Sequence, residues 1–337
     1  MPVIRDVIRL LEQIAPPDYQ EDYDNAGLLT GNPDMEIQGV LVCLDATEEV
    51  LLEAIRKGCN LIVAHHPIVF KGLKKITGAT YTERAVILAI RHELAIYAIH
   101  TNLDNMYKKG VNEKIGERLG LVQTRILAPK TQWQALQIYL ETKFLEPLQE
   151  KLIAAGFPRG IQLSADQEGK STVWLRTDAA RMPSLRAIVE KITGGSSDVT
   201  AIPTLDACPE IGAGLIGLLP QPLAPEDFLD FVKIRMNVKI VRHTPLINRP
   251  IHTVALCGGA GSFLLGKAIR QKADAFVSAD FKYHEFFDAD HRILIADIGH
   301  YESEHFTIEL LQQIISQNFC NFAAYCTEVM TNPVSYR

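Results

Sequence analysis

Several features that would place this sequence in a familiar class are missing. None of its six cysteines stands in a C-x-x-C pair, which argues against a zinc ribbon or a redox dithiol. No stretch approaches the roughly 20 consecutive apolar residues that a membrane-spanning helix needs. Residues 1–15 mix charged with apolar side chains and predict an amphipathic helix, not a signal peptide. We therefore expect a cytoplasmic protein with reduced cysteines and no membrane partner.

An excess of positive charge is also missing. The chain has 34 lysines and arginines against 40 aspartates and glutamates, which gives a net charge of −6. Nonspecific nucleic-acid binding usually requires a basic surface, so a nucleic-acid partner is not expected. Lys71, Lys74 and Lys75 stand close together and either attract a small anionic substrate, such as a nucleotide, or belong to a solvated loop. With 337 residues, 47% of them hydrophobic, the chain is long enough for two domains with ample cores.

What the sequence does contain is a pair of histidines at the end of an apolar run. Residues 61–64 are Leu-Ile-Val-Ala, and His65, His66 and Pro67 follow directly. Four consecutive apolar residues are typical of a strand buried on both faces, and a proline ends such an element. In α/β proteins, ligands bind at the carboxyl ends of strands, and imidazole is the commonest metal ligand. Alone, the pair is equally compatible with a surface loop.

Two further strand ends carry side chains of the same chemistry. The apolar stretch 94–99 is followed by His100 and Asp104, and the stretch 292–298 runs into His300 and Glu304. His300 and Glu304 are four residues apart near the start of a predicted helix, so they share one face. Imidazole and carboxylate ligands without thiolate favour zinc, iron or manganese.

Each of these residues also has a simpler interpretation. A carboxylate such as Asp104 suits the bridge between two cations, but alone it would be a turn residue or a helix cap. His100 is interpreted as a buried histidine that donates to a backbone carbonyl, or as a residue that orients a metal ligand. Asp45, at the end of the apolar strand 39–45, either approaches the metals indirectly or caps the following helix. The glycine-rich segment 258–261 favours close helix–strand packing over phosphate binding, because it fits no nucleotide-binding pattern.

The pattern of elements predicts a split main domain. Up to about residue 127, strands and helices alternate, which indicates a mixed or parallel sheet with helices packed on it. After residue 130 the order becomes βαββαβ, which is ferredoxin-like. The elements expected there are strands over 133–140, 161–163, 171–176 and 199–205 and helices over 144–155 and 182–193. Beyond them we expect a returning strand over 212–218, a helix that opens at 224–227 and a strand over 238–242. The predicted class is α/β, with an inserted ferredoxin-like α+β domain.

Several motifs of the sequence resemble those of a known family. The motifs that carry the resemblance are His65-His66-Pro67, His100 to Asp104, Gly299 to Glu304, Asp24 to Leu28, Cys257 to Ser262 and Asp280 to His284. Together they are similar to the NIF-three-like family, also called the YbgI type, whose members are often labelled GTP cyclohydrolase 1 type 2 homologues.

The resemblance implies several further properties. It implies a centre of two divalent metal ions, whose ligands fall here on His65, His66, Asp104, His300 and Glu304. It also implies a homo-oligomer, a toroidal hexamer with the metal sites facing an internal cavity. Some members carry an inserted domain of the CutA or PII type. The expected domains are then 1–128 and 246–337 for the two halves of the metal-binding domain, with 129–245 as the insert and its connecting segment.

The predicted function is hydrolysis that depends on a dinuclear metal centre. Hydroxide formed at zinc, iron or manganese ions would attack a nucleotide or phosphoester substrate, and the family label narrows this to a GTP cyclohydrolase 1 type 2-like reaction. His100, His284 or His305 would transfer protons. The alternative is a non-catalytic regulatory or interaction protein, in which the ions are structural or sensed and the inserted domain senses a ligand. Turnover by the metal-loaded protein separates the two.

Overall fold

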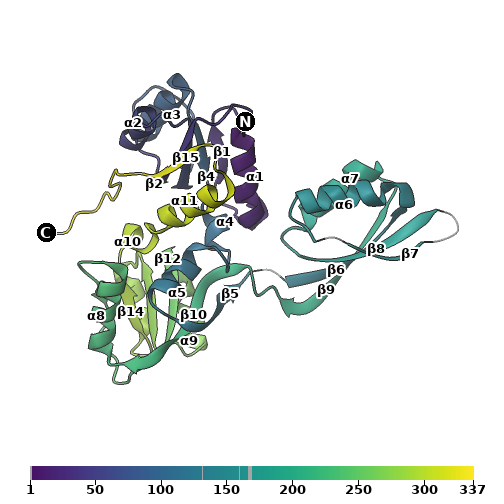
Figure 1. The fold of residues 1–337 in the computed structure, drawn as a ribbon. Coiled ribbons are helices and arrows are strands. Elements are labelled where there is room, and N and C mark those ends of the chain that lie inside the picture. Colours follow the sequence, from purple (N-terminus) through teal and green to yellow (C-terminus); the bar gives the residue numbers. More distant parts are fainter. Residues whose placement is uncertain (1, 131, 159, 166–168) are drawn as a thin grey trace. The chain divides into compact units, whose positions relative to one another are not determined.

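The computed structural model describes residues 2–130, 132–158, 160–165 and 169–337. The chain divides into two compact units. Unit 1 combines Met1–Ala128 with Ala213–Arg337, and unit 2 is Pro129–Gly212. The two ends of the chain thus belong to one unit, which contains two sheets (Figure 1).

The first sheet of unit 1 has five strands in the order β1-β4-β3-β2-β15. Its strands are β1 (Gly27–Thr30), β2 (Gly39–Asp45), β3 (Leu61–His66), β4 (Ala95–Ala98) and β15 (Ala323–Cys326). All neighbours are parallel except β1, which pairs antiparallel with β4. The helices that accompany it are α1 (Ile4–Ile14), η1 (Pro17–Tyr19), α2 (Glu48–Arg56), α3 (Tyr81–Arg91), α4 (Thr101–Asp104) and α11 (Thr307–Asn318). β2, β3 and β4 therefore all end at the same edge of the sheet.

The second sheet of unit 1 has six strands in the order β11-β14-β13-β12-β10-β5. Its strands are β5 (Val122–Pro129), β10 (Gly212–Leu223), β11 (Arg242–His243), β12 (Ile251–Ala260), β13 (Ala275–Ala279) and β14 (Leu294–Asp297). β12, β13 and β14 are mutually parallel neighbours. The accompanying helices are α5 (Val111–Arg118), α8 (Pro225–Met236), η3 (Ser262–Leu264), α9 (Leu265–Arg270), η4 (Tyr283–Ala289) and α10 (His300–Glu304).

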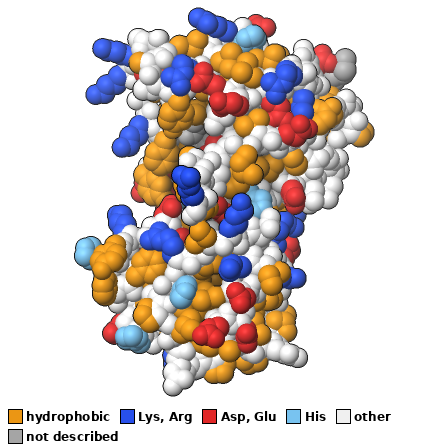
Figure 2. Space-filling model, turned by 90° about the vertical axis from the view of Figure 1, so that its left-hand side faces the viewer, with side chains coloured by type: hydrophobic (Ala, Val, Ile, Leu, Met, Phe, Trp, Pro, Cys, Tyr) orange, Lys and Arg blue, Asp and Glu red, His pale blue; other side chains and the backbone are white. Residues whose placement is uncertain are grey.

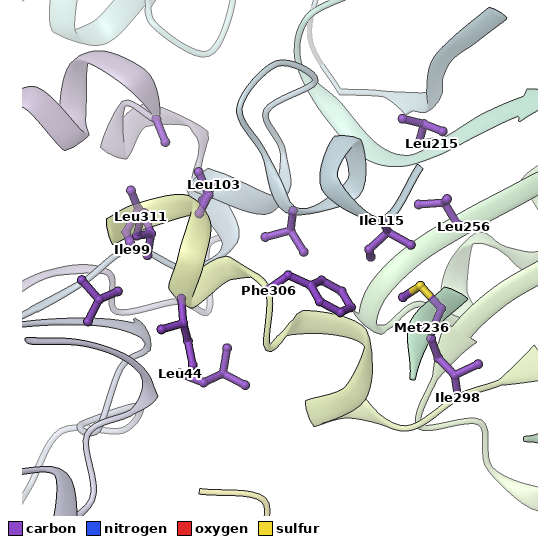
Figure 3. Close-up of a cluster of buried hydrophobic side chains, with 14 of the residues drawn as sticks. Leu44, Ile99, Leu103, Ile115, Leu215, Met236, Leu256, Ile298, Phe306 and Leu311 are labelled. Atoms are coloured by element: carbon purple, nitrogen blue, oxygen red, sulfur yellow. The ribbon is translucent and has the colours of Figure 1, made fainter. Parts of the chain in front are cut away.

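Helices cover both faces of each sheet because the strands are apolar on both sides. In the five-stranded sheet, α1 and α11 pack on one face and α2 and α3 on the other. One buried cluster extends from this sheet to the six-stranded sheet. Figure 3 shows Phe306 in the middle of it, with Leu44, Ile99 and Leu311 on one side and Met236 and Ile298 on the other. This shared core holds the segment 300–306 between the two sheets.

Unit 2 is a four-stranded sheet with two helices. In chain order its elements are β6 (Gln132–Glu141), η2 (Thr142–Phe144), α6 (Leu145–Ala154), β7 (Ile161–Ala165), β8 (Lys170–Asp178), α7 (Met182–Thr193) and β9 (Asp198–Ala207). The strands lie in the order β7-β8-β6-β9, and every pair is antiparallel. Leucines and valines of β6, β8, α6 and α7 form a core of its own, separate from that of unit 1.

The surface reflects the balanced composition. On the face drawn in Figure 2, lysines and arginines are interspersed with acidic and hydrophobic side chains and form no uninterrupted basic field. Among the described residues, no helix combines the length and the apolar character required to cross a bilayer.

The predicted elements agree with most of the structure, with two differences. The strand predicted over 238–242 is wrong: only Arg242 and His243 pair with β14, because the amide of Val238 instead donates to the carbonyl oxygen of Lys233 (3.0 Å) where α8 ends. Residues 213–245, expected to connect the insert to the second half of the main domain, lie in unit 1 and begin with the expected returning strand, β10. β10 pairs antiparallel with β12, and α8 packs in the core of unit 1, so the boundary between the two units along the chain lies at residue 212.

Candidate metal centre

The polar side chains of interest stand at the carboxyl ends of strands from both sheets of unit 1. His65 and His66 end β3, and Asp45, at the end of β2, lies opposite His66 in the parallel register. On the other sheet, β14 ends at Asp297, and α10 begins at His300. The shared core packs the two sheets together, which brings α10 against the end of β3.

The side chains converge on one carboxylate oxygen, Oε2 of Glu304. The Nε2 atoms of His66 and His300 lie 3.0 and 3.1 Å from it, and Nε2 of His65 lies 3.9 Å away. His65, His66 and Glu304 each offer one ligand atom, and these three atoms lie within 4.8 Å of one another. This spacing suits a single metal ion bound between them.

Two buried atoms beside Glu304 have no hydrogen-bond partner among the described residues. They are Nε2 of His65 and Oδ1 of Asp104, which lie 3.6 Å apart. A buried polar atom without a partner is costly, and a bound metal ion is one of the few groups that satisfy both a nitrogen lone pair and a carboxylate oxygen. The donor set of these residues therefore fits a metal ion.

Each imidazole is oriented by a hydrogen bond from its other nitrogen. Nδ1 of His65 donates to the carbonyl oxygen of Ile99 (2.8 Å), and Nδ1 of His66 donates to Oδ1 of Asp45 (2.8 Å). In the same way Nδ1 of His300 donates to Oδ2 of Asp280 (2.7 Å). Such bonds fix the tautomer, so that Nε2 is the nitrogen available to a metal, and they raise its basicity.

His100 is oriented by the same type of contact, although its position is different. Nδ1 of His100 donates to Oδ1 of Asp24 (2.8 Å), and the other carboxylate oxygen of Asp24 accepts from the amide of Thr101 (3.0 Å) and from its hydroxyl. The ring of His100 packs edge-on against the rings of His65 and His66, at 5.4 and 5.3 Å. His100 therefore contacts the histidine pair through its ring. Its hydrogen bond to Asp24 uses Nδ1 and not Nε2.

The pKa values reflect this dense packing of charge. Burial alone would lower the pKa of His66, but hydrogen bonds with Asp45 and Glu304 raise it to about 9. Burial would likewise lower the pKa of His300, which Asp280 and Glu304 raise to about 11. For His65 burial prevails and lowers the pKa to about 3. Burial, together with the charge of Glu304, raises the pKa of Asp104. Strongly shifted groups gathered in one cleft are typical of functional sites.

A glycine lines the other side of Glu304. Gly259 has φ +60°, and a Cβ placed on it would lie 2.4 Å from Oε1 of Glu304 and 3.2 Å from Cε1 of His300. Its amide donates to Oγ of Ser303 (2.9 Å), and the amide of Gly258 donates to Oδ1 of Asn112 (3.0 Å). Because both amides already have partners, this segment packs against α10 and does not offer them to a phosphate.

A cavity of about 390 Å³ opens beside these side chains. Its walls include His66, His100, Asp104, His300 and Glu304, together with the aromatic residues Tyr23, Phe70 and Phe263. All three aromatic side chains are more than two-fifths exposed, and the rings of Tyr23 and Phe70 lie 6.2 Å apart. The site is thus open to a molecule larger than water.

The structure brings the five predicted ligand residues to one place. His100, predicted to transfer protons, lies there too. His284 and His305, predicted for the same role, lie among aromatic neighbours instead: His284 is exposed beside Tyr283, and the ring of His305 stacks on that of Tyr301 at 5.8 Å. Neither lines the cavity, and their role stays a prediction.

The sequence assigned no individual role to Asp24 or Asp280, and it predicted only close helix–strand packing for the segment that contains Gly259. Asp280 directly follows β13, and the histidines are the last residues of β3, so its place at a strand end is the signal that could have found it. Asp24 precedes β1 in an irregular segment, where no periodicity marks it. Position 259 requires a glycine because the side chain of Glu304 packs against it, and this contact between distant segments leaves no signal in the sequence.

Comparisons with known proteins agree with this geometry. The sequence model of the Duf34/NIF3 family (NGG1p interacting factor 3) matches residues 2–333. A Staphylococcus epidermidis protein named GTP cyclohydrolase 1 type 2 homolog is 29% identical, with 99% of this chain and 100% of that protein aligned. The crystal structure of a Bacillus cereus protein related to NIF3 has a TM-score of 0.78 at 26% identity, covering 100% of this chain and 99% of that one. A Staphylococcus aureus structure, at 28% identity and the same coverage, has a TM-score of 0.79.

Proposed function

This chain belongs to the Duf34/NIF3 family, and we propose that it is a hydrolase that uses two divalent metal ions to act on a nucleotide or another phosphoester. The observation that carries the proposal is the convergence of three imidazole nitrogens on Oε2 of Glu304, next to the unpartnered atoms of His65 and Asp104. The name GTP cyclohydrolase 1 type 2 homolog, carried by relatives that align along nearly the whole chain, supports a nucleotide substrate.

The ions would be held by His65, His66, Asp104, His300 and Glu304. Glu304 takes the central position that the sequence pattern suggested for Asp104, because its Oε2 lies nearest to three imidazoles. When bound, zinc, iron or manganese ions would lower the pKa of a coordinated water and polarise the group under attack.

His100 is the residue we assign to proton transfer. Asp24 accepts from its Nδ1, which leaves Nε2 as the nitrogen that can take up or release a proton at the cavity. Burial alone would raise the pKa of Asp24, but hydrogen bonds from His100 and Thr101 lower it to about 2, so Asp24 stays ionised and keeps the ring oriented. A carboxylate that orients a histidine in this way is a recurring arrangement in catalysis.

The walls of the cavity suit a ring-containing, anionic substrate. Tyr23, Phe70 and Phe263 present exposed aromatic surfaces beside the metal-binding side chains, and aromatic faces stack readily on nucleobases. Lys71, Lys74 and Lys75, which follow Phe70 along the chain, are exposed and would attract phosphate groups. The proposal therefore places the base against the aromatic rings and the reacting atom at the ions.

Three further properties belong to the same proposal. The βαββαβ order of unit 2, with strands in the order β7-β8-β6-β9, supports an inserted ferredoxin-like domain of the CutA or PII type. The homo-oligomer, expected to be a toroidal hexamer, is tested by light scattering of the purified protein. The cytoplasmic location likewise stays a prediction.

The test combines metal analysis with a substrate panel. Wild-type protein loaded with zinc, manganese or iron is expected to hydrolyse at least one compound in a panel of nucleotides and phosphoesters. Asp104→Asn should reduce that activity by more than the 10–100-fold that indirect partners of a metal site typically cost. The matched control is Asp34→Asn, an exposed carboxylate that pairs with Arg5, and it should leave activity unchanged.

One result would favour the alternative function. If the wild type binds metal and a nucleotide but hydrolyses nothing in the panel, the protein is a metal-binding regulatory or interaction protein. Unit 2, which has a core of its own, would then be the part that senses a ligand.

A further inference from the structure

The last residues of the chain form an irregular segment that returns to the metal site. After β15, residues 327–336, here called the C-terminal strap, run without helix or strand (Figure 1). The beginning of the strap is attached to β2 and α2. The amide of Thr327 donates to the carbonyl oxygen of Val42 (2.9 Å), and its hydroxyl and the amide of Glu328 donate to Glu53.

Thr331 connects the strap to a candidate metal ligand. Its hydroxyl donates to Oδ2 of Asp45 (2.7 Å), and Oδ1 of the same carboxylate accepts from Nδ1 of His66 (2.8 Å). Nε2 of His66 in turn lies 3.0 Å from Oε2 of Glu304. Thr331, Asp45 and His66 thus form a continuous series of contacts that leads to the centre of the site.

The next residue of the strap contacts the opposite side of the site. Nδ2 of Asn332 donates to Oε1 of Glu302 (2.9 Å), which lies on α10 between His300 and Glu304. His66 belongs to the five-stranded sheet, whereas α10 follows a strand of the six-stranded sheet. Two consecutive residues of the strap are therefore hydrogen-bonded to Asp45 and Glu302, which stand beside His66 on one sheet and between His300 and Glu304 on α10.

A second cavity, of about 490 Å³, lies where the strap crosses the site. Asn332, Pro333 and Tyr336 form part of its wall, and His66 and His300 line both this cavity and the one that contains Asp104. Asp45 and Asp280, which accept from the Nδ1 atoms of these two histidines, face it as well. The strap thus forms part of the cavity wall on the side of the site where Asp45 and Asp280 orient these two histidines.

We propose that Thr331 is a positioning residue of the metal centre and that the C-terminal strap fixes the orientation of His66 through Asp45. The inference rests on the metal centre of the proposed function. A carboxylate turns about its last side-chain bond, and the hydrogen bond from Thr331 holds Oδ2 so that Oδ1 remains directed at His66. Residues that orient metal ligands in this way typically change metal affinity by 10–100-fold when they are replaced.

The test measures zinc affinity of the full-length protein by competition with a chelator. Thr331→Val keeps the shape of the side chain but removes the hydroxyl, and it should weaken zinc binding about tenfold, the low end of that range. Thr331→Ser restores the hydroxyl and should bind zinc nearly as well as the wild type. Asn332→Ala, which leaves Thr331 in place, should weaken binding in the same direction.

The absorption spectrum of bound cobalt distinguishes a change in ligand geometry from a loss of overall stability. The visible absorption bands of the Co²⁺-loaded protein depend on ligand geometry, so Thr331→Val should alter them while Thr331→Ser should not. The matched control is Thr327→Val, which removes a hydroxyl from the same strap at its attachment to Glu53. It should leave zinc affinity and the cobalt spectrum unchanged.

Three results would overturn the inference. If Thr331→Val binds zinc like the wild type, with an unchanged cobalt spectrum, Thr331 does not position His66, and the metal centre itself stands. If Thr327→Val loses as much affinity as Thr331→Val, the strap acts only by its attachment and not through Asp45. If the wild type binds no zinc, manganese or iron, the proposed function fails together with the inference.

Discussion

Gly259 provides the sharpest test of how closely the site is packed. Replacement by alanine adds one methyl group, and the Cβ would lie 2.4 Å from Oε1 of Glu304. An ordinary contact needs about 3.4 Å, so either the carboxylate or the backbone of β12 has to move by about 1 Å. Ligand distances in metal sites are held within about 0.2 Å, and the displacement is several times larger. We therefore expect Gly259→Ala to weaken zinc binding by at least about tenfold.

The same substitution also imposes a backbone cost that must be separated from the effect on the metal. Gly259 has φ +60°, and an alanine in this left-handed conformation costs about 1–2 kcal/mol. Gly58 has φ +68° with nothing within 4 Å of its added Cβ, so Gly58→Ala carries the backbone cost alone. Urea denaturation of the metal-free proteins should show that both variants lose unfolding free energy because of this backbone conformation. Any additional loss in Gly259→Ala then measures the cost of the clash with Glu304.

Zinc affinity then separates the two variants. By chelator competition, Gly58→Ala should bind zinc like the wild type, whereas Gly259→Ala should not. Equal affinities for both variants and the wild type would refute the reasoning, because Glu304 would then have room to give way without disturbing any bound ion.

The remaining predictions concern the fold. Hydrogen bonds from Thr77 and Ala79 lower the pKa of Glu83 to about 2, so the stability that Glu83 contributes is present above its ordinary pKa of 4.5 and is lost as the pH falls towards 2. The urea midpoints of the wild type and Glu83→Gln should therefore differ most at neutral pH and converge on acidification. Replacing residues 129–212 by a short flexible linker should leave a folded unit 1 with unchanged zinc content, because unit 2 has its own core and a backbone hydrogen bond joins its two ends. Phe306→Ala should cost about 3–5 kcal/mol of unfolding free energy in urea, since its buried ring packs between both halves of the core (Figure 3).

The sequence predicted the strand ends well because buried parallel strands appear as uninterrupted apolar runs. β3 shows this most clearly: its four apolar residues are completely buried, and the histidines that follow stand at its end. The helical spacing of His300 and Glu304 correctly placed both on one face, and their side chains lie 3.1 Å apart. Where periodicity was weak, as over residues 238–242, the prediction of a strand was wrong.

The contacts between distant segments could not be predicted in this way. Asp45 and Thr331 are 286 positions apart, and His66 and Glu304 are 238 apart. Neither spacing nor composition indicates that such residues meet, because the packing of α10 against the end of β3 depends on the whole core. The convergence of ligands was therefore expected from a family resemblance, whereas the outer contacts of Asp24, Asp280 and Thr331 emerged only from the structure.

The central claim is that imidazole and carboxylate ligands from both sheets of unit 1 bind metal ions around Glu304. The most direct measurement is an anomalous diffraction map of crystals grown with zinc, recorded on either side of the zinc absorption edge. The account predicts anomalous peaks about 2.0–2.2 Å from a carboxylate oxygen of Glu304 and from Nε2 of His65 or His66. Zinc-loaded crystals whose peaks all lie away from Glu304 would contradict it.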